Sequence, residues 1–235
     1  MTKALEGKLA LVTGASRGIG AATAEAMAAE GAHVVLTARN AADLEAVEQR
    51  IHEAGGSATI APLDLTESDS IARLATAIAG RWDALDILVI NAAMLGTIGP
   101  VVTIDAKEFN KLLTLNLLAS QALLTNFDPL LRRSAAGRVI ALTSSVARGP
   151  RAYWGAYGAS KAALETLVAA YGEEVKNIAP VRVAIVNPGA TATQMRARAY
   201  PGENPATLKD PAVVGRRLAA LAAEGFDVNH YERIN

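Results

Sequence analysis

The alternation of short apolar runs with longer helical stretches most constrains how this chain can fold. Helical stretches lie at residues 21–30, 41–54, about 67–80, 106 to about 131, and 152–175. The apolar runs that we interpret as strands lie at residues 9–12, 32–37, 57–61, 86–90, 138–142 and 181–186. Strands that alternate with helices of about ten residues or more form parallel sheets with helices on both faces. We therefore predict an α/β fold with a doubly wound parallel sheet, in a single domain over residues 1–235.

The composition excludes several classes of protein and of site. Acidic and basic residues balance at 23 each, so charge indicates neither a nucleic acid nor a membrane surface as a partner. The sequence has no cysteine, which excludes disulfides, thiolate catalysis and cysteine-bound metals. The histidines, His33, His52 and His230, lack metal-ligand spacing, so we predict no metal site.

The N-terminal residues and the length of the apolar runs predict a cytoplasmic protein. Lys3, Glu6 and Lys8 precede the first predicted strand, a pattern unlike a signal peptide. No apolar run reaches about 18 residues without charged or polar interruptions, so we expect no membrane-spanning helix.

A glycine-rich turn, Thr-Gly-Ala-Ser-Arg-Gly-Ile-Gly, follows the first predicted strand at residues 13–20. A helix that begins at such a turn attracts phosphate groups, because its first backbone N–H groups and its dipole point at the ligand. Gly14 permits the tight turn, and Gly18 and Gly20 let a cofactor and the strand approach the backbone closely. The turn predicts a dinucleotide site, with an ordinary strand-to-helix turn as the alternative.

Tyr157 and Lys161 lie four residues apart in the helical stretch 152–175, so they should share one helix face. A phenol has a pKa of about 10, and a cation within about 4–6 Å favours its ionised form. Such a pair can supply a general acid or base near neutral pH, although the same spacing also arises on solvated helices.

Polar residues and glycines follow the ends of several predicted strands. They are residues 13–20, Asp64, Asn91, Ser144, Ser145 and residues 187–189. Ligands of doubly wound sheets bind outside the carboxyl ends of the strands, where the strand order reverses. We therefore predict the binding site at this edge of the sheet.

Residues 7–193 closely resemble the classical short-chain dehydrogenase/reductase family in four motifs that keep their order and spacing. Residues 13–20 match T-G-x-x-x-G-x-G, residues 86–93 approximate D-x-L-V-N-N-A-G, residues 157–161 match Y-x-x-x-K, and residues 188–193 match P-G-x-x-x-T. Ser-Ser-Val at 144–146 followed by Trp-Gly-Ala-Tyr at 154–157 resembles one group of bacterial oxidoreductases in the family. The resemblance implies a Rossmann-like fold and hydride transfer between a nicotinamide cofactor and a carbonyl or alcohol carbon.

Three departures from the family pattern bear on the site. Ile90 and Ala93 replace the usual asparagine and glycine after the fourth strand, whereas Asn91 is retained. Ser145 lies twelve residues before Tyr157, where thirteen is common and would select Ser144; we prefer Ser145 because it precedes the valine. No glycine-rich closing strand is recognisable in residues 226–235, which bears on the substrate lid and on a tetramer interface.

The resemblance implies four catalytic residues. Tyr157 would exchange a proton with the substrate oxygen, and Lys161 would lower the pKa of Tyr157 and bind the nicotinamide ribose. Ser145 would hold the substrate oxygen as negative charge develops on it. Asn116 would bend the long helix and support a water relay to the lysine, with a polar residue on a helix surface as the alternative.

The resemblance also implies NADP(H) as the cofactor, because the second strand ends at Arg39 without the acidic residue usual in NAD(H)-dependent members. Arg17 and Arg39 would face the ribose phosphate, Asp64 the adenine amino group, and Asn91 the adenosine. The motif positions give the full predicted cofactor set: Gly14, Ser16, Arg17, Gly18, Ile19, Gly20, Arg39, Asp64, Leu65, Asn91, Ala92, Tyr157, Lys161, Pro188, Gly189, Thr191 and Thr193.

The implied substrate is a small-molecule carbonyl or alcohol, under a short lid at about residues 190–212. Reduction of a 3-oxoacyl thioester on an acyl-carrier protein stays open, since Arg132, Arg133 and Arg138 could meet an acidic carrier. A sensor or scaffold that binds the cofactor without turnover is the alternative of another class. An apolar substrate pocket, or ordinary packing, is predicted for Met94, Leu95, Tyr153, Trp154 and Met195.

We expect a homodimer, with a homotetramer as a further possibility. The stretch 106–131 is apolar on nearly all faces, and a helix of this kind must be buried. The helix with Tyr157 carries a second apolar stripe at Leu164, Leu167, Val168 and Tyr171. In the resembled family these two helices form the dimer interface.

Overall fold

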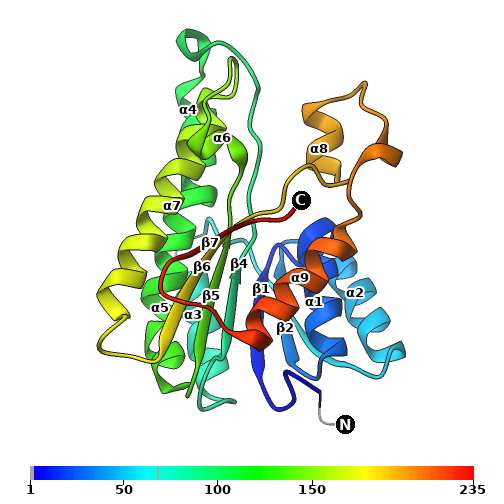
Figure 1. Cartoon of the computed structure of the whole chain (residues 1–235), viewed down its shortest axis with the longest axis vertical. Helices are drawn as coiled ribbons and strands as arrows, with labels where there is room; N and C mark the ends of the chain where they lie inside the picture. Colours follow the sequence, from blue (N-terminus) through cyan, green and yellow to red (C-terminus); the bar gives the residue numbers. More distant parts are fainter. Residues whose placement is uncertain (1–2, 68) are drawn as a thin grey trace.

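Seven strands form one fully parallel sheet in the computed structural model, which describes residues 3–67 and 69–235 (Figure 1). The strands follow the order β3-β2-β1-β4-β5-β6-β7 across the sheet. This order confirms the prediction of an α/β fold with a Rossmann-like, doubly wound sheet. The strands are β1 (Leu9–Thr13), β2 (His33–Ala38), β3 (Ser57–Pro62), β4 (Ile87–Ile90), β5 (Gly137–Leu142), β6 (Val181–Asn187) and β7 (His230–Arg233).

Helices connect the strands and cover the sheet. The α-helices are α1 (Gly18–Ala29), α2 (Ala41–Glu53), α3 (Ser70–Ala79), α4 (Ala106–Leu113), α5 (Ala119–Arg133), α6 (Ser145–Arg148), α7 (Gly155–Val175), α8 (Gln194–Ala199) and α9 (Pro211–Glu224). Short 3₁₀ turns lie at η1 (Val101–Thr103) and η3 (Pro205–Thr207), and the π-helical turn η2 (Thr114–Leu118) joins α4 to α5.

Two apolar cores lie on opposite faces of the sheet. Helices α1, α2 and α9 cover one face, where Met27, Leu44 and Leu218 are completely buried (Figure 1). Helices α3, α5 and α7 cover the other face, where Phe127 and Val168 are completely buried. Because both faces are covered, the central strands carry continuous apolar runs rather than alternating ones, which is why they are legible in the sequence.

The strand order reverses at β1, which pairs with β2 on one side and with β4 on the other. Val12 lies opposite both Leu36 and Val89, so the carboxyl ends of the three strands are level. The chain leaves β1 toward α1 on one face and leaves β4 toward α4 and α5 on the other. A crevice opens where two such connections diverge, and the predicted cofactor residues surround this point.

Most predicted elements end within one or two residues of the observed ones, but some differ more. Helix α1 begins at Gly18, three residues before its predicted start, because the glycine turn continues directly into the helix. Helix α7 begins at Gly155, three residues later than predicted. Helix α3 begins at Ser70 rather than near residue 67; residue 68, like residues 1 and 2 of the predicted domain, lies outside the described residues.

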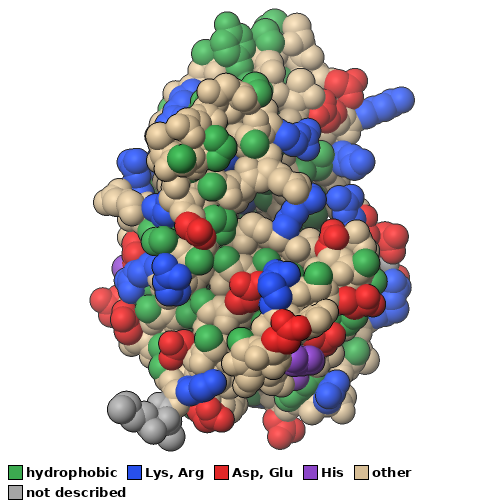
Figure 2. All heavy atoms as spheres, turned by 90° about the vertical axis from the view of Figure 1, so that its right-hand side faces the viewer, with side chains coloured by type: hydrophobic (Ala, Val, Ile, Leu, Met, Phe, Trp, Pro, Cys, Tyr) green, Lys and Arg blue, Asp and Glu red, His purple; other side chains and the backbone are tan. Residues whose placement is uncertain are grey.

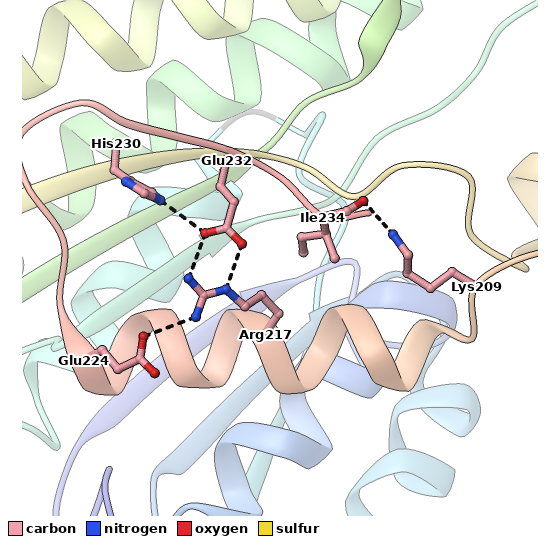
Figure 3. Close-up of polar contacts among 6 residues, drawn as sticks. All are labelled: Lys209, Arg217, Glu224, His230, Glu232 and Ile234. Carbon is pink, nitrogen blue, oxygen red and sulfur yellow. Dashed lines mark hydrogen bonds and ion pairs between the residues drawn. The ribbon is translucent and has the colours of Figure 1, made fainter.

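Residues 226–235, in which no closing strand was recognisable, contain β7, which pairs with β6 in parallel. Figure 3 shows what holds this strand: the guanidinium of Arg217 in α9 donates to both carboxylate oxygens of Glu232, at 2.7 and 2.9 Å. Arg217 also donates to Glu224 at 3.1 Å, and His230 Nε2 lies 3.2 Å from Glu232. Charged side chains rather than an apolar run fix this edge strand, so its sequence carries no hydrophobic signature.

The second apolar stripe predicted on α7 mostly faces the sheet of the same chain. Leu164 and Val168 are 1% and 0% exposed, and Tyr171 is 9% exposed. Leu167 is half-buried. Three of the four stripe residues are therefore used in the core, and the apolar surface that α7 leaves exposed or half-buried consists of Leu167 and alanines such as Ala159, Ala163 and Ala170.

The surface has the mixed character that the balanced composition predicts. Acidic and basic side chains are interspersed over the face of the molecule shown in Figure 2. No helix among the described residues is both long and apolar enough to cross a bilayer. Within residues 3–67 and 69–235, no group of three or more His, Asp and Glu side chains is arranged to hold a metal ion.

Helices α1 and α9 approach so closely at Gly215 that a side chain there has no room. A Cβ would overlap the carbonyl oxygen of Ala22 and lie 2.9 Å from the backbone N of Thr23. Gly215→Ala should lower the free energy of unfolding by about 1–3 kcal/mol, because overpacking outweighs the higher helix propensity of alanine. Urea unfolding followed by circular dichroism measures this change.

Gly80→Ala is the matched control, because Gly80 is the C-cap residue of α3 with a φ of −75°, and an added Cβ would lie 3.5 Å from its nearest neighbour. We expect this control to be neutral or slightly stabilising. Equal destabilisation by the two alanines would contradict the close approach of α1 and α9.

Candidate active site

Tyr157 and Lys161 are buried together at the carboxyl end of β5. Successive turns of α7 carry them, and their exposed fractions are only 9% and 2%. The Lys161 ammonium donates to the carbonyl oxygen of Leu142, the last residue of β5, at 2.8 Å. The phenol oxygen of Tyr157 lies 4.0 Å from the sulfur of Met195 in α8. The predicted pair therefore occupies a dry position under α8 rather than a solvated helix face.

Burial moves the pKa values of the pair in opposite directions. It raises the pKa of Tyr157 to about 12, since an ionised phenolate would be poorly solvated there. It lowers the pKa of Lys161 to about 8, and the nearby Glu165 partly opposes this change. Burial sets the direction of the Tyr157 pKa in the chain by itself, and the lowering effect of Lys161 stays a prediction. At neutral pH Tyr157 is a neutral phenol, which is the form that can donate a proton.

Asn116 lies in the π-helical turn η2 and is completely buried, which excludes a surface role. Its side-chain oxygen accepts from the backbone N–H of Met94 at 2.8 Å, and its amide donates to the Met94 carbonyl at 2.9 Å. The same amide donates to the Ser160 hydroxyl at 3.0 Å. Asn116 thus ties the loop after β4 to α7 beside Lys161, and single π-turns of this kind are frequent at functional sites.

The glycine turn packs against the end of β4 without room for side chains. Gly14 and Gly18 have φ values of +65° and +57°, which favour glycine, and a Cβ at Gly20 would overlap the Gly14 carbonyl oxygen. The Asn91 amide donates to the carbonyl oxygens of Thr13 at 2.8 Å and of Gly14 at 3.2 Å. Asn91 therefore lies beneath the turn and shapes it, with both amide hydrogens directed to the turn backbone.

The crevice has the donors that a dinucleotide requires. Helix α1 directs its first backbone N–H groups toward it, with Arg17 as its N-cap residue. Arg17 and Arg39 are exposed, and neither forms an ion pair with a described carboxylate. Burial alone would raise the pKa of Asp64, but hydrogen bonds from the N–H and hydroxyl of Thr66, and more weakly Arg39, lower it. The residues fit a bound dinucleotide whose phosphates meet the turn.

The predicted nicotinamide loop, residues 188–193, lies on the other side of the same crevice. Gly189 has a φ of +71° and donates its N–H to the Asn187 side chain at 3.0 Å. A Cβ at Gly18 would lie 3.4 Å from the Thr193 methyl carbon, so the glycine turn and this loop meet. The remaining predicted cofactor residues, Ser16, Ile19, Leu65, Ala92, Pro188 and Thr191, lie on these same segments.

Sequence reasoning missed Lys209, which holds this loop. Its ammonium donates to the carbonyl oxygen of Pro188 at 3.1 Å. It also donates to the carbonyl oxygen of Ile234 at 2.6 Å (Figure 3). Its backbone pairs with Thr191 and closes the base of the segment that carries α8. Lysine bonded to two carbonyls has no sequence motif, so no signal could have identified it.

The two candidate serines follow β5 but have different partners. Ser144 is the N-cap of α6, and its hydroxyl accepts from the Val146 N–H at 3.5 Å. The Ser145 hydroxyl accepts from the Arg151 guanidinium at 3.1 Å. Ser144 is thus engaged in a local cap, whereas Ser145 is reached by a side chain from the loop before α7.

Three of the five predicted pocket residues gather around Tyr157. Leu95 is buried against it, and Trp154 and Met195 are partly buried in the same cluster. The Trp154 ring lies 6.0 Å from the Tyr157 ring, centroid to centroid. Tyr153 instead has 59% of its surface exposed, which contradicts its predicted place in the pocket wall. Of Met94, the structure shows a backbone role, the hydrogen bonds to Asn116.

The arginines considered for an acidic carrier lie far from this cluster. Arg132 and Arg133 end α5, and Arg132 is paired with Asp128 at 2.7 Å. Arg138 is the second residue of β5, at the amino end of the strand, and its guanidinium carbon lies 5.5 Å from the centroid of the Phe226 ring. These side chains are therefore at the opposite end of the strands from Tyr157.

Comparison with known proteins decides the family. The model of the short chain dehydrogenase family matches residues 8–204. The chain belongs to this family. It is 38% identical over 211 residues to the uncharacterized oxidoreductase YciK of Escherichia coli K12, covering 88% of this chain and 83% of that protein.

Solved structures of short-chain dehydrogenases share the whole fold of this family member. A Salmonella enterica serovar Typhi short chain dehydrogenase has a TM-score of 0.94 at 35% identity, with 99% of this chain and 98% of that one covered. A metagenomic short-chain oxidoreductase in complex with NADP has a TM-score of 0.84 at 36% identity, with 99% of both chains covered. The dehydrogenase family and its oxidoreductase class thus agree with the resemblance found in the sequence.

Proposed function

We propose that this protein is an NADP(H)-dependent oxidoreductase that transfers a hydride between nicotinamide and a carbonyl or alcohol substrate. Tyr157 is its general acid and base. The observation that carries the proposal is the dry Tyr157–Lys161 pair at the carboxyl end of β5, beside the crevice that the glycine turn borders. A sensor or scaffold has no need for a buried phenol and ammonium under a helix.

The choice of NADP(H) rests on two exposed arginines. Arg17 precedes α1 and Arg39 follows β2, where the ribose end of a dinucleotide lies in this fold, and no acidic residue occupies the end of β2. A guanidinium binds a phosphate through two parallel, charge-assisted hydrogen bonds. The NADP complex of the metagenomic relative supports the same choice.

The chain's own groups account for proton transfer and substrate orientation. When bound, the nicotinamide supplies the hydride to the carbonyl carbon or accepts it in the reverse direction. During reduction, neutral Tyr157 donates its proton to the substrate oxygen, and Ser145 hydrogen-bonds that oxygen as it gains negative charge. Lys161 has three N–H donors, of which one goes to Leu142 and two remain for ribose hydroxyls.

Residues 190–212 form the proposed lid over this site, within a single domain that spans residues 1–235. Helix α8 brings Met195 to the phenol of Tyr157, and the rings of Tyr200 and Trp154 lie tilted by 30° with their centroids 5.6 Å apart. Lys209 anchors the base of the segment. The apolar contacts suit a carbonyl substrate with an apolar or aromatic body.

Tyr157→Phe should abolish turnover and leave NADPH affinity nearly unchanged, because the phenol oxygen meets the substrate and not the dinucleotide. Lys161→Ala should weaken both, since the ammonium serves the tyrosine and the ribose. NADPH consumption with a panel of aldehydes and ketones measures turnover, and NADPH fluorescence measures binding. If Tyr157→Phe keeps most of the activity, the mechanism is wrong; if the wild type binds NADPH but reduces no carbonyl, a sensor replaces the enzyme.

The serine pair has a separate prediction. Ser145→Ala should lower kcat about 10²–10³-fold, the range for loss of one oxyanion donor. Ser144→Ala should leave kcat nearly unchanged and reduce the free energy of unfolding by about 1 kcal/mol, the typical value for a lost N-cap. Kinetics at saturating NADPH and urea unfolding of both variants separate the roles. If Ser144→Ala instead loses most of its kcat, the catalytic role belongs to Ser144, which lies thirteen residues before Tyr157.

NADPH should support a far higher kcat/KM than NADH. Each charge-assisted hydrogen bond to the phosphate contributes about 1.5–3 kcal/mol, so Arg17→Ala and Arg39→Ala should each reduce the preference about tenfold or more. Arg73→Ala, an exposed arginine of α3, is the control and should keep the preference. Equal turnover with NADH in the wild type would exclude the proposed phosphate site.

We also propose a homodimer through the outer face of η2 and α5. Leu118 is 57% exposed there, beside a hollow of about 280 Å³ that Ile71, Ala119 and Ala122 help to line. Leu118→Glu should therefore yield monomers in light scattering at micromolar concentration, because burying the carboxylate in an apolar contact is costly. Ile178→Glu, at a residue that is 68% exposed and outside this face, should stay dimeric. A monomeric wild type would contradict the proposal.

A further inference from the structure

We propose that Glu165 is a positioning residue that keeps Lys161 in its charged, hydrogen-bonding form through the field of its buried carboxylate. The relevance of this role to turnover rests on the proposed function, whereas the interaction itself belongs to the chain alone. Nothing in the motif pattern marks Glu165, which lies four residues beyond the family's lysine.

Glu165 continues the row of Tyr157 and Lys161 along α7. The three residues are spaced by four, so their side chains lie on one face on successive turns. Glu165 is only 9% exposed, and glutamate side chains are rarely buried this far unless they are paired. Its contacts lie next to those of the lysine: Lys161 donates to the carbonyl of Leu142, and Glu165 accepts from the hydroxyl of the next residue, Thr143.

Two donors fix the carboxylate of Glu165. The Thr143 hydroxyl donates to Oε1 at 2.6 Å, and the Arg148 guanidinium donates to Oε2 at 2.7 Å. Glu165 and Lys161 form no ion pair within 4 Å in the described chain, so the carboxylate acts on the ammonium through space. Two opposite charges more than 4 Å apart attract each other far more strongly in a buried site than in water, because the effective dielectric constant is lower there.

The groups around Lys161 act on its pKa in opposite directions. Burial lowers the pKa of Lys161 to about 8, and Glu165 raises it. Arg148 from α6 counteracts the carboxylate that it binds. Tyr231 from β7 covers that guanidinium, with the Arg148 carbon 3.4 Å from the ring centroid. Tyr157 is the remaining titratable group beside the lysine, and it is neutral. The groups of β5 and η2 that lie near the lysine are uncharged.

The position of Arg148 depends on the edge strand β7. Tyr231 lies on β7 opposite Ile185, and the neighbouring Glu232 is held by Arg217 of α9 (Figure 3). The strand therefore keeps an aromatic ring over Arg148 and Arg148 on Glu165. Removal of Arg148 would leave the negative charge of Glu165 unpaired, whereas removal of Glu165 would take away the carboxylate that stabilises the charged lysine. The two changes must shift the Lys161 titration in opposite directions.

The test is titration of ¹³C-lysine-labelled protein by NMR without cofactor. The Lys161 signal is identified by its absence from Lys161→Met, among the seven lysines of the chain. Glu165→Gln should lower the Lys161 titration midpoint by about one pH unit, and Arg148→Met should raise it. Glu174→Gln removes an exposed carboxylate from the same helix and should leave it unchanged. Arg148 is largely exposed, so its variant tests the proposal even if Glu165→Gln does not fold.

The same variants connect the interaction to turnover. The alkaline limb of the pH profile of kcat should move to lower pH in Glu165→Gln and to higher pH in Arg148→Met. A purely structural defect would lower kcat without shifting this limb in opposite directions in the two variants. An unchanged Lys161 midpoint in Glu165→Gln, or shifts of the same sign in both variants, would overturn the proposal. A wild type that reduces no carbonyl would refute the proposed function and leave the NMR result standing.

Discussion

The site depends on the close approach of the glycine turn to the end of β4. The Thr13 hydroxyl donates to the Val89 carbonyl at 3.0 Å and accepts from the Asn91 N–H at 2.9 Å, which joins β1 to β4 at the point where the strand order reverses. Gly14 and Gly20 then bring the start of α1 onto that junction. The proposed phosphate contacts of the glycine turn depend on this geometry, because it sets where the dipole of α1 points.

The sequence predicted the elements whose burial leaves a local pattern. Parallel strands covered on both faces are continuous apolar runs, and the glycine turn and the Tyr157–Lys161 spacing are local features. The edge strand β7 was not predictable because an ion pair from α9 holds it, across 15 positions of the chain. The role of Lys209 and the inward direction of the α7 stripe were not predicted for the same reason. Each depends on segments that are far apart in the sequence and that the fold brings together.

The site residues show a similar division. The motifs identified Tyr157, Lys161 and Asn116, whereas the burial that raises the pKa of Tyr157 is encoded in no motif. Tyr153 precedes the site in sequence but projects into solvent, as its φ of +73° turns the backbone before α7. The residue types and their spacing therefore predict which reaction the site could carry out. The pKa values and the orientation of the side chains can be described only from the packed structure.

The anchoring of Ile234 by Lys209 has a practical consequence for handling the protein. Asn235 follows Ile234 directly, so any polypeptide joined after it, a purification tag included, leaves the molecule beside the Pro188–Gly189 loop. Lys8, by contrast, pairs with Asp86 at the amino ends of the strands, on the far side of the sheet. A fusion before residue 3 would therefore start at the opposite ends of the strands from the Pro188–Gly189 loop, whereas one after Asn235 would start beside that loop.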